Sequence, residues 1–278
     1  MRLYVTVVVS VAVVLLIVGM HQRWRWVLPV ARWWDDARPQ IAAYIRCAPA
    51  TFIYLFVLTI TTWVLHGSPE AVRHALLFEH STNLKHLKSD PVTVLVTSAF
   101  WLTGAELWLW VVLFPLVLAP AERWLGTLRT MVVFAVGHVG ATIVTAAGLG
   151  FMIRHGLAPQ RLRDVIDVGS SYGFCCVAAV FSYRLPGIRR WVWAATLLVG
   201  ASVLVAWRDG FTDYGHLAAV VIGLCLYPLT RAPSVRHRDH WPIWRPPEIM
   251  VIAERERIEA HQRVVQGDAN PPARPDPR

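Results

Sequence analysis

Long apolar runs alternate with shorter polar stretches along most of the chain. Each run holds few charged residues and comes close to, or exceeds, the roughly 20 residues that an α-helix needs to cross a bilayer. Because a backbone in lipid must satisfy its own hydrogen bonds, such runs form helices. We therefore predict an all-α polytopic membrane protein. Its transmembrane helices are expected at residues 3–20, 47–65, 93–120, 131–151, 165–183, 191–207 and 211–229.

The polar stretches divide the chain into four parts. Residues 1–20 are predicted to form one extra N-terminal transmembrane helix, because the run ends without the small-residue cleavage pattern of a secretory signal. Residues 21–46 are basic and rich in Trp, which is typical of an amphipathic segment in the membrane interface. Residues 47–229 hold the other six helices. Residues 230–278 are a hydrophilic tail, in which the sequence allows a short helix over 248–265.

Composition and charge support the membrane assignment. Only 16% of the 278 residues are charged, whereas soluble domains carry about 25%. Many of the 14 Trp residues lie at the ends of the apolar runs, and indole rings favour the headgroup level. The net charge of +9 comes from basic residues that flank the predicted helices. We therefore assign this charge to contact with the lipid bilayer and not to nucleic acid.

The distribution of Arg predicts the orientation of the chain, because cytoplasmic loops carry an excess of Lys and Arg. Arg is concentrated before the second run, between the third and fourth, between the fifth and sixth, and in the tail. We therefore expect a cytoplasmic C-terminus and an N-terminus on the outer side. The excess of Arg over Lys, with many Val, Ala and Pro, favours a bacterial protein and hence the bacterial plasma membrane.

Two polar spots interrupt the apolar runs. Residues 167–173, with the sequence DVGSSYG, lie near the start of the fifth run, and residues 213–219, with the sequence DYGHLAA, near the start of the seventh. Ionisable residues inside membrane helices are rare and point first to function. Both helices run from the outer to the inner side in the predicted topology, so Ser171 and His216 could meet at one depth. A Ser hydroxyl becomes a useful nucleophile when a base such as His lies within hydrogen-bond reach.

Small residues beside these spots favour close helix packing. Gly169 and Gly173 are four apart, as in G-x-x-x-G, and are expected to share one helix face. Ala219 and Gly223 have the same spacing below His216. These two stripes would supply the short distance between helices that a Ser–His pair requires.

The same residues also allow a purely structural interpretation. A Ser in a Gly-rich helix often bonds back to its own helix, and a single membrane His often links two helices. Asp213, three residues before His216, could orient the imidazole or could complement the dipole at the helix N-terminus. Asp167, four residues and one helical turn before Ser171, allows the dipole interpretation as well.

Four short motifs occur in order along the six-helix part. Residues 97–100 carry the sequence TSAF, 122–126 ERWLG, 169–171 GSS and 215–223 GHLAAVVIG. In this order they resemble the rhomboid family of intramembrane serine proteases. They are similar to the segment that leads into its second core helix, the E-x-x-x-G that closes that helix, the start of its G-x-S-G motif and its A-H-x-x-G pattern with a later glycine. The resemblance covers residues 47–229 and implies a six-helix core with both ends cytoplasmic.

The resemblance implies a Ser–His dyad, with Ser171 as nucleophile and His216 as base. It further implies cleavage of a peptide bond in or near the membrane segment of another protein, without a metal or a cofactor. Residues that could support the dyad are Ser170, Tyr172, Asp213 and His138.

Three features depart from the family pattern. Tyr172 replaces the glycine that follows the nucleophile, and Ala219 replaces the glycine of the pattern after the His. The family also places a His and an Asn on its second core helix to stabilise the oxyanion. Leu107 and Val111 fall at these positions, and neither side chain donates a hydrogen bond. The loss of one such donor typically costs about 10²–10³ in rate.

Two functions therefore remain open at the level of sequence. The backbone N–H of Ser171, or the side chain of His138, could replace the missing donors and keep an active serine protease. Otherwise the chain is an inactive rhomboid-like protein that binds the transmembrane helices of partner proteins.

Other classes of membrane protein fit less well. A transporter would need internal repeats, broken helices or charges at the bilayer midplane, and the sequence shows no repeat and a nearly charge-free midplane. A membrane metalloprotease would need H-E-x-x-H or an equivalent cluster. His74, His80 and His86 are six residues apart and do not share one helix face, so we predict no metal site.

Overall fold

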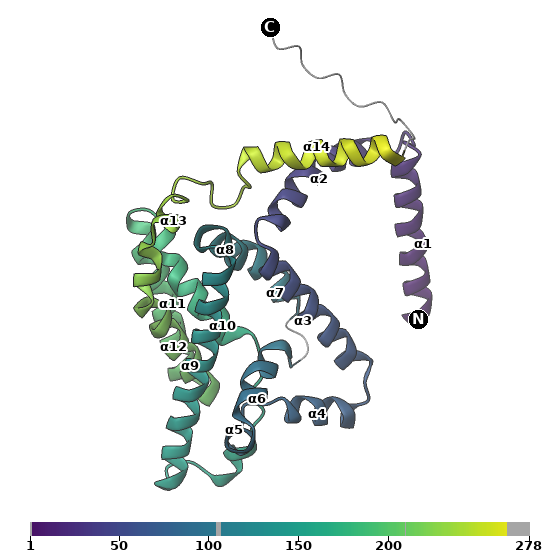
Figure 1. Cartoon of the computed structure of the whole chain (residues 1–278). Helices are drawn as coiled ribbons and strands as arrows, with labels where there is room; N and C mark the ends of the chain where they lie inside the picture. Colours follow the sequence, from purple (N-terminus) through teal and green to yellow (C-terminus); the bar gives the residue numbers. More distant parts are fainter. Residues whose placement is uncertain (1, 104–106, 209, 266–278) are drawn as a thin grey trace. The chain divides into compact units, whose positions relative to one another are not determined.

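The computed structural model describes residues 2–103, 107–208 and 210–265 (Figure 1). Within these ranges the secondary structure is helical and contains no strand, which confirms the all-α class. The chain divides into two compact units, which we describe separately. One consists of Met1–Arg46 with Arg245–Arg278, and the other of Cys47–Trp244.

Five described helices are long and apolar enough to cross a membrane, so the chain is an integral membrane protein. They correspond to the second, third, fourth, sixth and seventh predicted runs. They are α3 (Pro49–Gly67), the continuous helix of α7 (Leu107–Leu113), a π-helical segment (Phe114–Leu118) and α8 (Ala119–Leu125), α9 (Thr127–Arg154), α11 (Ile188–Arg208), and α12 (Phe211–Cys225) with a 3₁₀ extension (Tyr227–Arg231).

The third predicted run, 93–120, differs from expectation because it is not one helix. Helix α6 (Pro91–Thr97) and a 3₁₀ turn (Ser98–Phe100) come first, residues 101–103 are not helical, and the described part of the spanning helix starts at Leu107. The backbone carbonyls of the 3₁₀ turn accept hydrogen bonds from distant parts of the chain, and that of Ser98 also accepts from the Trp101 N–H at 3.5 Å. The donors are the Gly169 N–H to Ser98 (2.9 Å), the Tyr54 hydroxyl to Ala99 (2.5 Å) and the Thr61 hydroxyl to Phe100 (2.8 Å).

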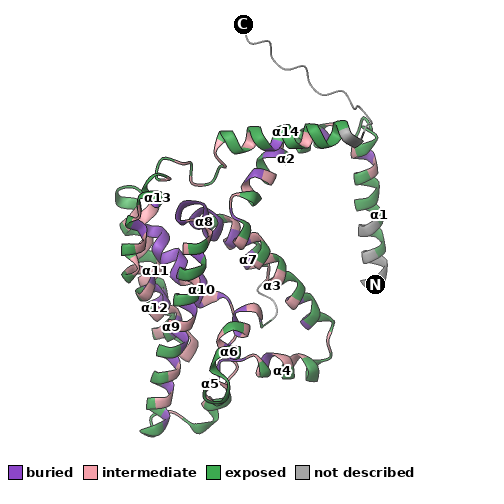
Figure 2. Cartoon of the chain, viewed as in Figure 1, coloured by how far each residue is buried: buried purple, intermediate pink, exposed green. Residues whose placement is uncertain are grey.

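The fifth predicted run also differs, because its helix is short. Helix α10 (Ser171–Phe181) has 11 residues and continues into a 3₁₀ turn (Ser182–Arg184). Its length is about 16 Å at the usual rise per residue. Most of α10 is buried between α9 and α12 (Figure 2). A helix so covered by its neighbours does not need to span the bilayer by itself.

The polar connections contain shorter helices. Helices α4 (Glu70–Glu79) and α5 (Leu84–Ser89) lie between α3 and α6, and a 3₁₀ turn (Gln160–Asp164) follows α9. Helix α13 (Pro233–Arg236) follows the last spanning helix.

Glu122 of the ERWLG motif joins two helices of the larger unit. Its carboxylate is 1% exposed and accepts hydrogen bonds from the first turn of α3, at Ala50 N (3.0 Å), Thr51 N (2.8 Å) and Thr51 Oγ1 (2.7 Å). A carboxylate at this position accepts hydrogen bonds from N–H groups that have no partner within the helix, and its negative charge is stabilised by the positive end of the helix dipole. Gly126, at φ +89°, then ends α8 and allows α9 to begin.

The described residues of the smaller unit form three helices: α1 (Arg2–His21), α2 (Leu28–Arg46) and α14 (Glu248–Val265). Figure 1 shows α14 running alongside α2. Arg46 of α2 pairs with the nearly buried Glu254 of α14 at 2.9 Å. Helix α14 occupies the range over which the sequence allowed a helix.

Candidate active site

Ser171 is the first residue of α10, and the chain before it is held in an irregular conformation. Residues 165–170 bond to the loop after α4 and to the 3₁₀ turn after α6. Gly169 adopts φ +140°, a conformation that L-residues with a side chain rarely take. The bonds are Asp167 N–H to Ser81 Oγ (2.8 Å), Thr82 N–H to Asp167 O (3.0 Å) and Gly169 N–H to Ser98 O (2.9 Å).

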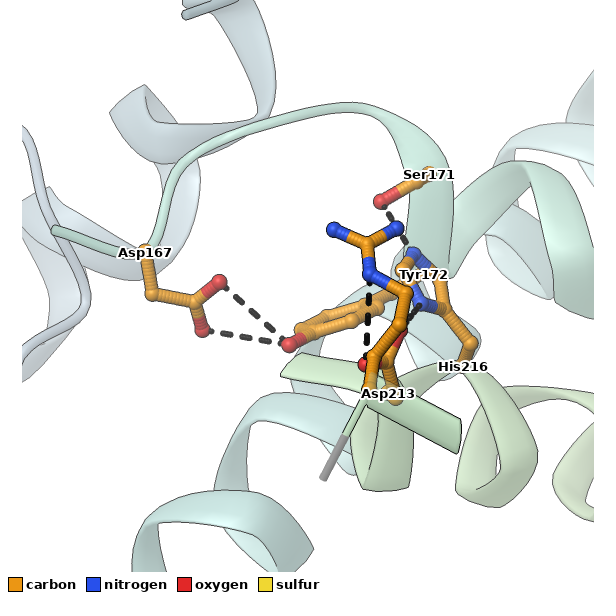
Figure 3. A network of polar contacts seen from close by, with 6 residues as sticks. Asp167, Ser171, Tyr172, Asp213 and His216 are labelled. Carbon is orange, nitrogen blue, oxygen red and sulfur yellow. Dashed lines mark hydrogen bonds and ion pairs between the residues drawn. The ribbon is translucent and has the colours of Figure 1, made fainter. Parts of the chain in front are cut away.

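His216 lies in the second turn of α12 and meets Ser171 across the contact between α10 and α12. Its Nε2 is 2.9 Å from Ser171 Oγ (Figure 3). This distance is within the range in which a base accepts a proton from a hydroxyl. The His216 side chain is 22% exposed and Ser171 is half-buried, so both residues remain partly accessible.

Tyr172 supports the imidazole from the side. Its ring meets the His216 ring edge to face, with centroids 5.2 Å apart and an interplanar angle of 73°. Its hydroxyl donates to the buried carboxylate of Asp167, 3.3 Å from each oxygen (Figure 3). Thr82 Oγ1 donates to the same carboxylate at 3.2 Å. The residue that replaces the expected glycine is therefore fixed at both ends, by Asp167 and by His216.

Asp167 was expected one helical turn before Ser171, and this expectation is wrong. Asp167 precedes α10 and lies in the irregular segment, where the hydroxyl of Tyr172 reaches back to it. The carboxylate is 6% exposed. Its hydrogen bonds to Thr82 and Tyr172 reduce the free-energy cost of burying it.

Asp213 lies in the first turn of α12, buried beside His216. Its Oδ1 is 3.9 Å from His216 Nδ1, and its Oδ2 is 3.9 Å from Arg208 Nε. These distances are too long for hydrogen bonds but short enough for electrostatic attraction. Asp213 therefore has the geometry for both functions that the sequence allowed, at the helix N-terminus and beside the imidazole.

Three of the four small residues predicted to pack helices lie at close contacts. A Cβ on Gly173 would meet the ring of Phe134 on α9, and an enlarged Gly223 would meet the backbone of α10 at Cys176. Ala219 is fully buried. The prediction for Gly169 is wrong, because this residue precedes α10 and shares no helix face with Gly173.

The other predicted supporting residues lie away from the dyad hydrogen bond. His138 of α9 is buried, and its Nε2 lies 3.0 Å from Ser98 Oγ. Its ring is 6.3 Å from that of Tyr172. Ser170 is fully buried before α10, and its carbonyl accepts from Phe174 N–H. His138 thus anchors the turn that holds Gly169.

The two positions aligned with the oxyanion residues face different surroundings. Leu107 is half-buried against the core, and Val111 is 48% exposed. Neither side chain carries a hydrogen-bond donor. Glu106, which lies next to Leu107 in sequence, is outside the described residues.

These features define an all-helical polytopic membrane protein with a Ser–His pair shared by two adjacent helices. A family model described as rhomboid-like protein matches residues 43–236. The match covers more than half of the chain, and the chain therefore belongs to the rhomboid-like family. A search of curated proteins and a search of solved structures find no match.

Sequence reasoning missed the residues that hold the site from a distance. Ser81, Thr82 and Ser98 bond to the segment before Ser171 from 71 or more positions earlier in the chain, and no local pattern marks such bonds. Gly215 was noted only as part of a motif. A Cβ at Gly215 would meet the Tyr172 ring, so its lack of a side chain is what admits that ring.

Proposed function

We propose that this chain is a rhomboid-type intramembrane serine protease that cleaves a transmembrane protein in or near its membrane segment. Ser171 is the nucleophile and His216 is the general base. The observation that carries this proposal is the distance of 2.9 Å between Ser171 Oγ and His216 Nε2. No metal or cofactor takes part in the proposed reaction.

In the proposed acylation, one proton passes from Ser171 to the leaving group by way of His216. His216 Nε2 takes the hydroxyl proton while Ser171 Oγ attacks the carbonyl carbon of the scissile peptide bond. The imidazolium then gives this proton to the leaving amine as the C–N bond breaks, which leaves an acyl-enzyme ester. Water, activated by the neutral imidazole, hydrolyses the ester. Asp213, 3.9 Å from His216 Nδ1, favours the imidazolium electrostatically.

The N-terminus of α10 supplies backbone donors for the oxyanion. The first N–H groups of an α-helix have no intrahelical acceptor and lie at the positive end of its dipole. Ser171 is the first residue of this helix, so its own N–H is available beside its hydroxyl. Such a donor stabilises a developing negative charge without side chains at Leu107 and Val111.

Water must reach the site for hydrolysis. The irregular backbone of residues 165–170 supports such access, because non-helical backbone at membrane depth occurs where it is buried in protein or lines a water-filled cavity. Ser171 and His216 are only partly buried. We further propose that this side of the membrane is the outer side, and that the C-terminus is in the cytoplasm of a bacterium.

A second function is favoured by one observation. Leu107 and Val111 provide no donor where the family places two, so the rate of acyl transfer could be too low to matter. In that case the chain would be an inactive rhomboid-like protein that binds the transmembrane helices of its partners.

Labelling with a fluorophosphonate probe tests the proposal. We expect the purified, detergent-solubilised protein to react, and Ser171→Ala and His216→Ala to lose the label. Ser182→Ala is the matched control, because it removes a buried hydroxyl at the opposite end of α10. Mapping of the labelled peptide distinguishes Ser171 from its neighbour Ser170.

The result has two clear outcomes. Label on Ser171 that depends on His216 supports the protease. A folded protein that stays unlabelled, while an active rhomboid reacts in parallel, would favour the helix-binding function.

A further inference from the structure

Helix α2 presents its largest apolar side chains outward. Five of them are 40–63% exposed. Their spacing of three, four and seven residues places them on one helix face. We name this face the apolar stripe, and it consists of Val30, Trp33, Trp34, Ile41 and Ile45.

The opposite face of α2 is occupied within the same unit. Its buried residues are the small Ala31, Pro39 and Ala43, and α14 packs along α2. The pair Arg46–Glu254 closes one end of this contact. Since α14 takes the small-residue face, it leaves the apolar stripe uncovered, which reverses the arrangement of a helix pair in water.

The connections of α2 place both of its ends at a membrane surface. Helix α1, before it, has 20 residues of almost wholly apolar sequence, which is enough to span a bilayer. Helix α3, which begins three residues after α2 ends, is one of the five candidate spans. A helix of about 28 Å that follows a helix of spanning length and precedes a candidate span has both of its ends at the membrane surface.

The corner between α1 and α2 is ordered. Arg23 adopts φ 55° and turns the chain, and Trp24 N–H donates to Gly19 O at 2.9 Å. The Trp24 ring lies so close to Gly19 that a Cβ there would meet it at 3.1 Å. Helix α2 therefore leaves the end of α1 in a fixed direction and not through a flexible linker.

Basic side chains also lie in α2 and just before it. Arg25, Arg32 and Arg38 are exposed, and in the described part of the chain they form no ion pair. Trp26, next to Arg25, is 94% exposed. Indole rings and Arg side chains beside an apolar helix face are the combination that binds the headgroup region of anionic membranes.

We propose that α2 is a membrane-surface helix whose apolar stripe inserts among lipid chains and whose Arg side chains bind the phosphate groups of anionic phospholipids. Because α14 packs on the opposite face of α2, this contact also holds residues 248–265 of the hydrophilic tail at the membrane surface. The occupant of the stripe is the bilayer and not a soluble protein, since the chain connections keep α2 at the lipid boundary. This surface is separate from the Ser–His site and does not depend on catalysis.

Photocrosslinking in a bilayer tests the proposal. The full-length protein carries p-benzoylphenylalanine at Trp34 or Ile41, in the stripe, and at Asp36 as the matched control on the polar side of the same helix. Each variant is reconstituted in vesicles of phosphatidylethanolamine and phosphatidylglycerol, irradiated, and measured by intact mass. Ser171→Ala is included to confirm that the result is independent of the proposed activity.

We expect lipid adducts at positions 34 and 41 to exceed those at 36 several-fold. Replacing Arg25, Arg32 and Arg38 together by Gln should lower the phosphatidylglycerol share of the adducts. Equal, low lipid labelling at all three positions would overturn the proposal. So would cross-linked protein dimers at positions 34 and 41, which would identify a second copy as the occupant. Unchanged lipid composition in the Arg variant would overturn the role of the Arg side chains.

Discussion

At the scale of single residues, the candidate site depends on contacts that fix two side chains. The Ser171 hydroxyl is presented by the N-terminus of α10, and the His216 imidazole is supported by the edge of Tyr172. Tyr172 is in turn held by Asp167, which bonds to Thr82 in a distant loop. The imidazole of His216 is therefore linked through Tyr172 to Asp167 and Thr82.

The first prediction concerns the carboxylate of Asp167. Asp167→Ala removes the acceptor of a buried Tyr172 hydroxyl, and we expect the free energy of unfolding to fall by about 1–3 kcal/mol. We also expect the rate of fluorophosphonate labelling to fall, because the ring beside His216 becomes free to move. Thermal unfolding in detergent and labelling kinetics measure the two effects.

Asp167→Asn is the control, since its amide oxygen still accepts from Tyr172. This variant should label faster than Asp167→Ala. Equal rates for both would show that Asp167 does not position the dyad through Tyr172.

The second prediction concerns Trp110 of α7, one residue before the donor-less Val111. Its indole N–H is buried and, among the described residues, has no acceptor. Its ring lies 5.4 Å from that of Phe174, one turn after Ser171. A buried donor without a partner close to the nucleophile's helix is a candidate to stabilise the oxyanion.

If Trp110 serves in this way, Trp110→Phe should reduce the labelling rate by about 10²–10³, with little change in apparent affinity for the probe. Trp108→Phe is the matched control, because Trp108 is 69% exposed on the same helix. An unchanged rate in Trp110→Phe would leave the α10 backbone as the source of donors.

At the scale of elements, close packing of α10 against α12 sets the distance between Ser171 and His216. Small residues make this packing possible, and Gly215 is one of them. A Cβ at this position would meet the Tyr172 ring. The two helices would have to separate, or the ring would have to leave the imidazole.

The third prediction follows from this contact. Gly215→Ala should destabilise the protein by about 1–3 kcal/mol through overpacking. It should also slow the labelling of Ser171 by more than this loss of stability alone would explain. Gly200→Ala on α11 is the control, because a Cβ there would meet nothing within 4 Å. Retention of full labelling in Gly215→Ala would argue against a dyad that needs this helix distance.

At the scale of the whole molecule, the chain is a rhomboid-like membrane protein in which Arg is concentrated in every second loop. The fourth prediction is its orientation. Alkaline phosphatase fused after Arg278 should be inactive and a green fluorescent protein fused there should fluoresce, since the first folds only outside the cytoplasm and the second inside. The opposite result would reverse the predicted topology and move the candidate site to the cytoplasmic side.

Much of the architecture could be predicted because each spanning helix corresponds to a local pattern in the sequence. A run of about 20 apolar residues needs no distant partner to be helical in lipid. The candidate spans that contain α3, α9, α11 and α12 begin and end within a few residues of the predicted runs. The helix over residues 248–265 could likewise be predicted from local composition. The pairing of Ser171 with His216 followed from topology, because two helices of the same direction place their starts at one depth.

The sequence by itself thus determined the all-helical membrane class, the rhomboid-like motifs and the two residues of the candidate dyad. Only the tertiary structure decided that the third run breaks after Phe100, that α10 begins at Ser171 and that Gly169 precedes that helix. Each of these depends on a hydrogen bond or a close contact between segments far apart in the chain, such as Gly169 with Ser98 or Tyr172 with Gly215. The length of an apolar run and its local spacing predict whether a segment forms a helix in lipid. They do not predict which distant group forms a hydrogen bond with a backbone N–H or C=O where the helix is interrupted.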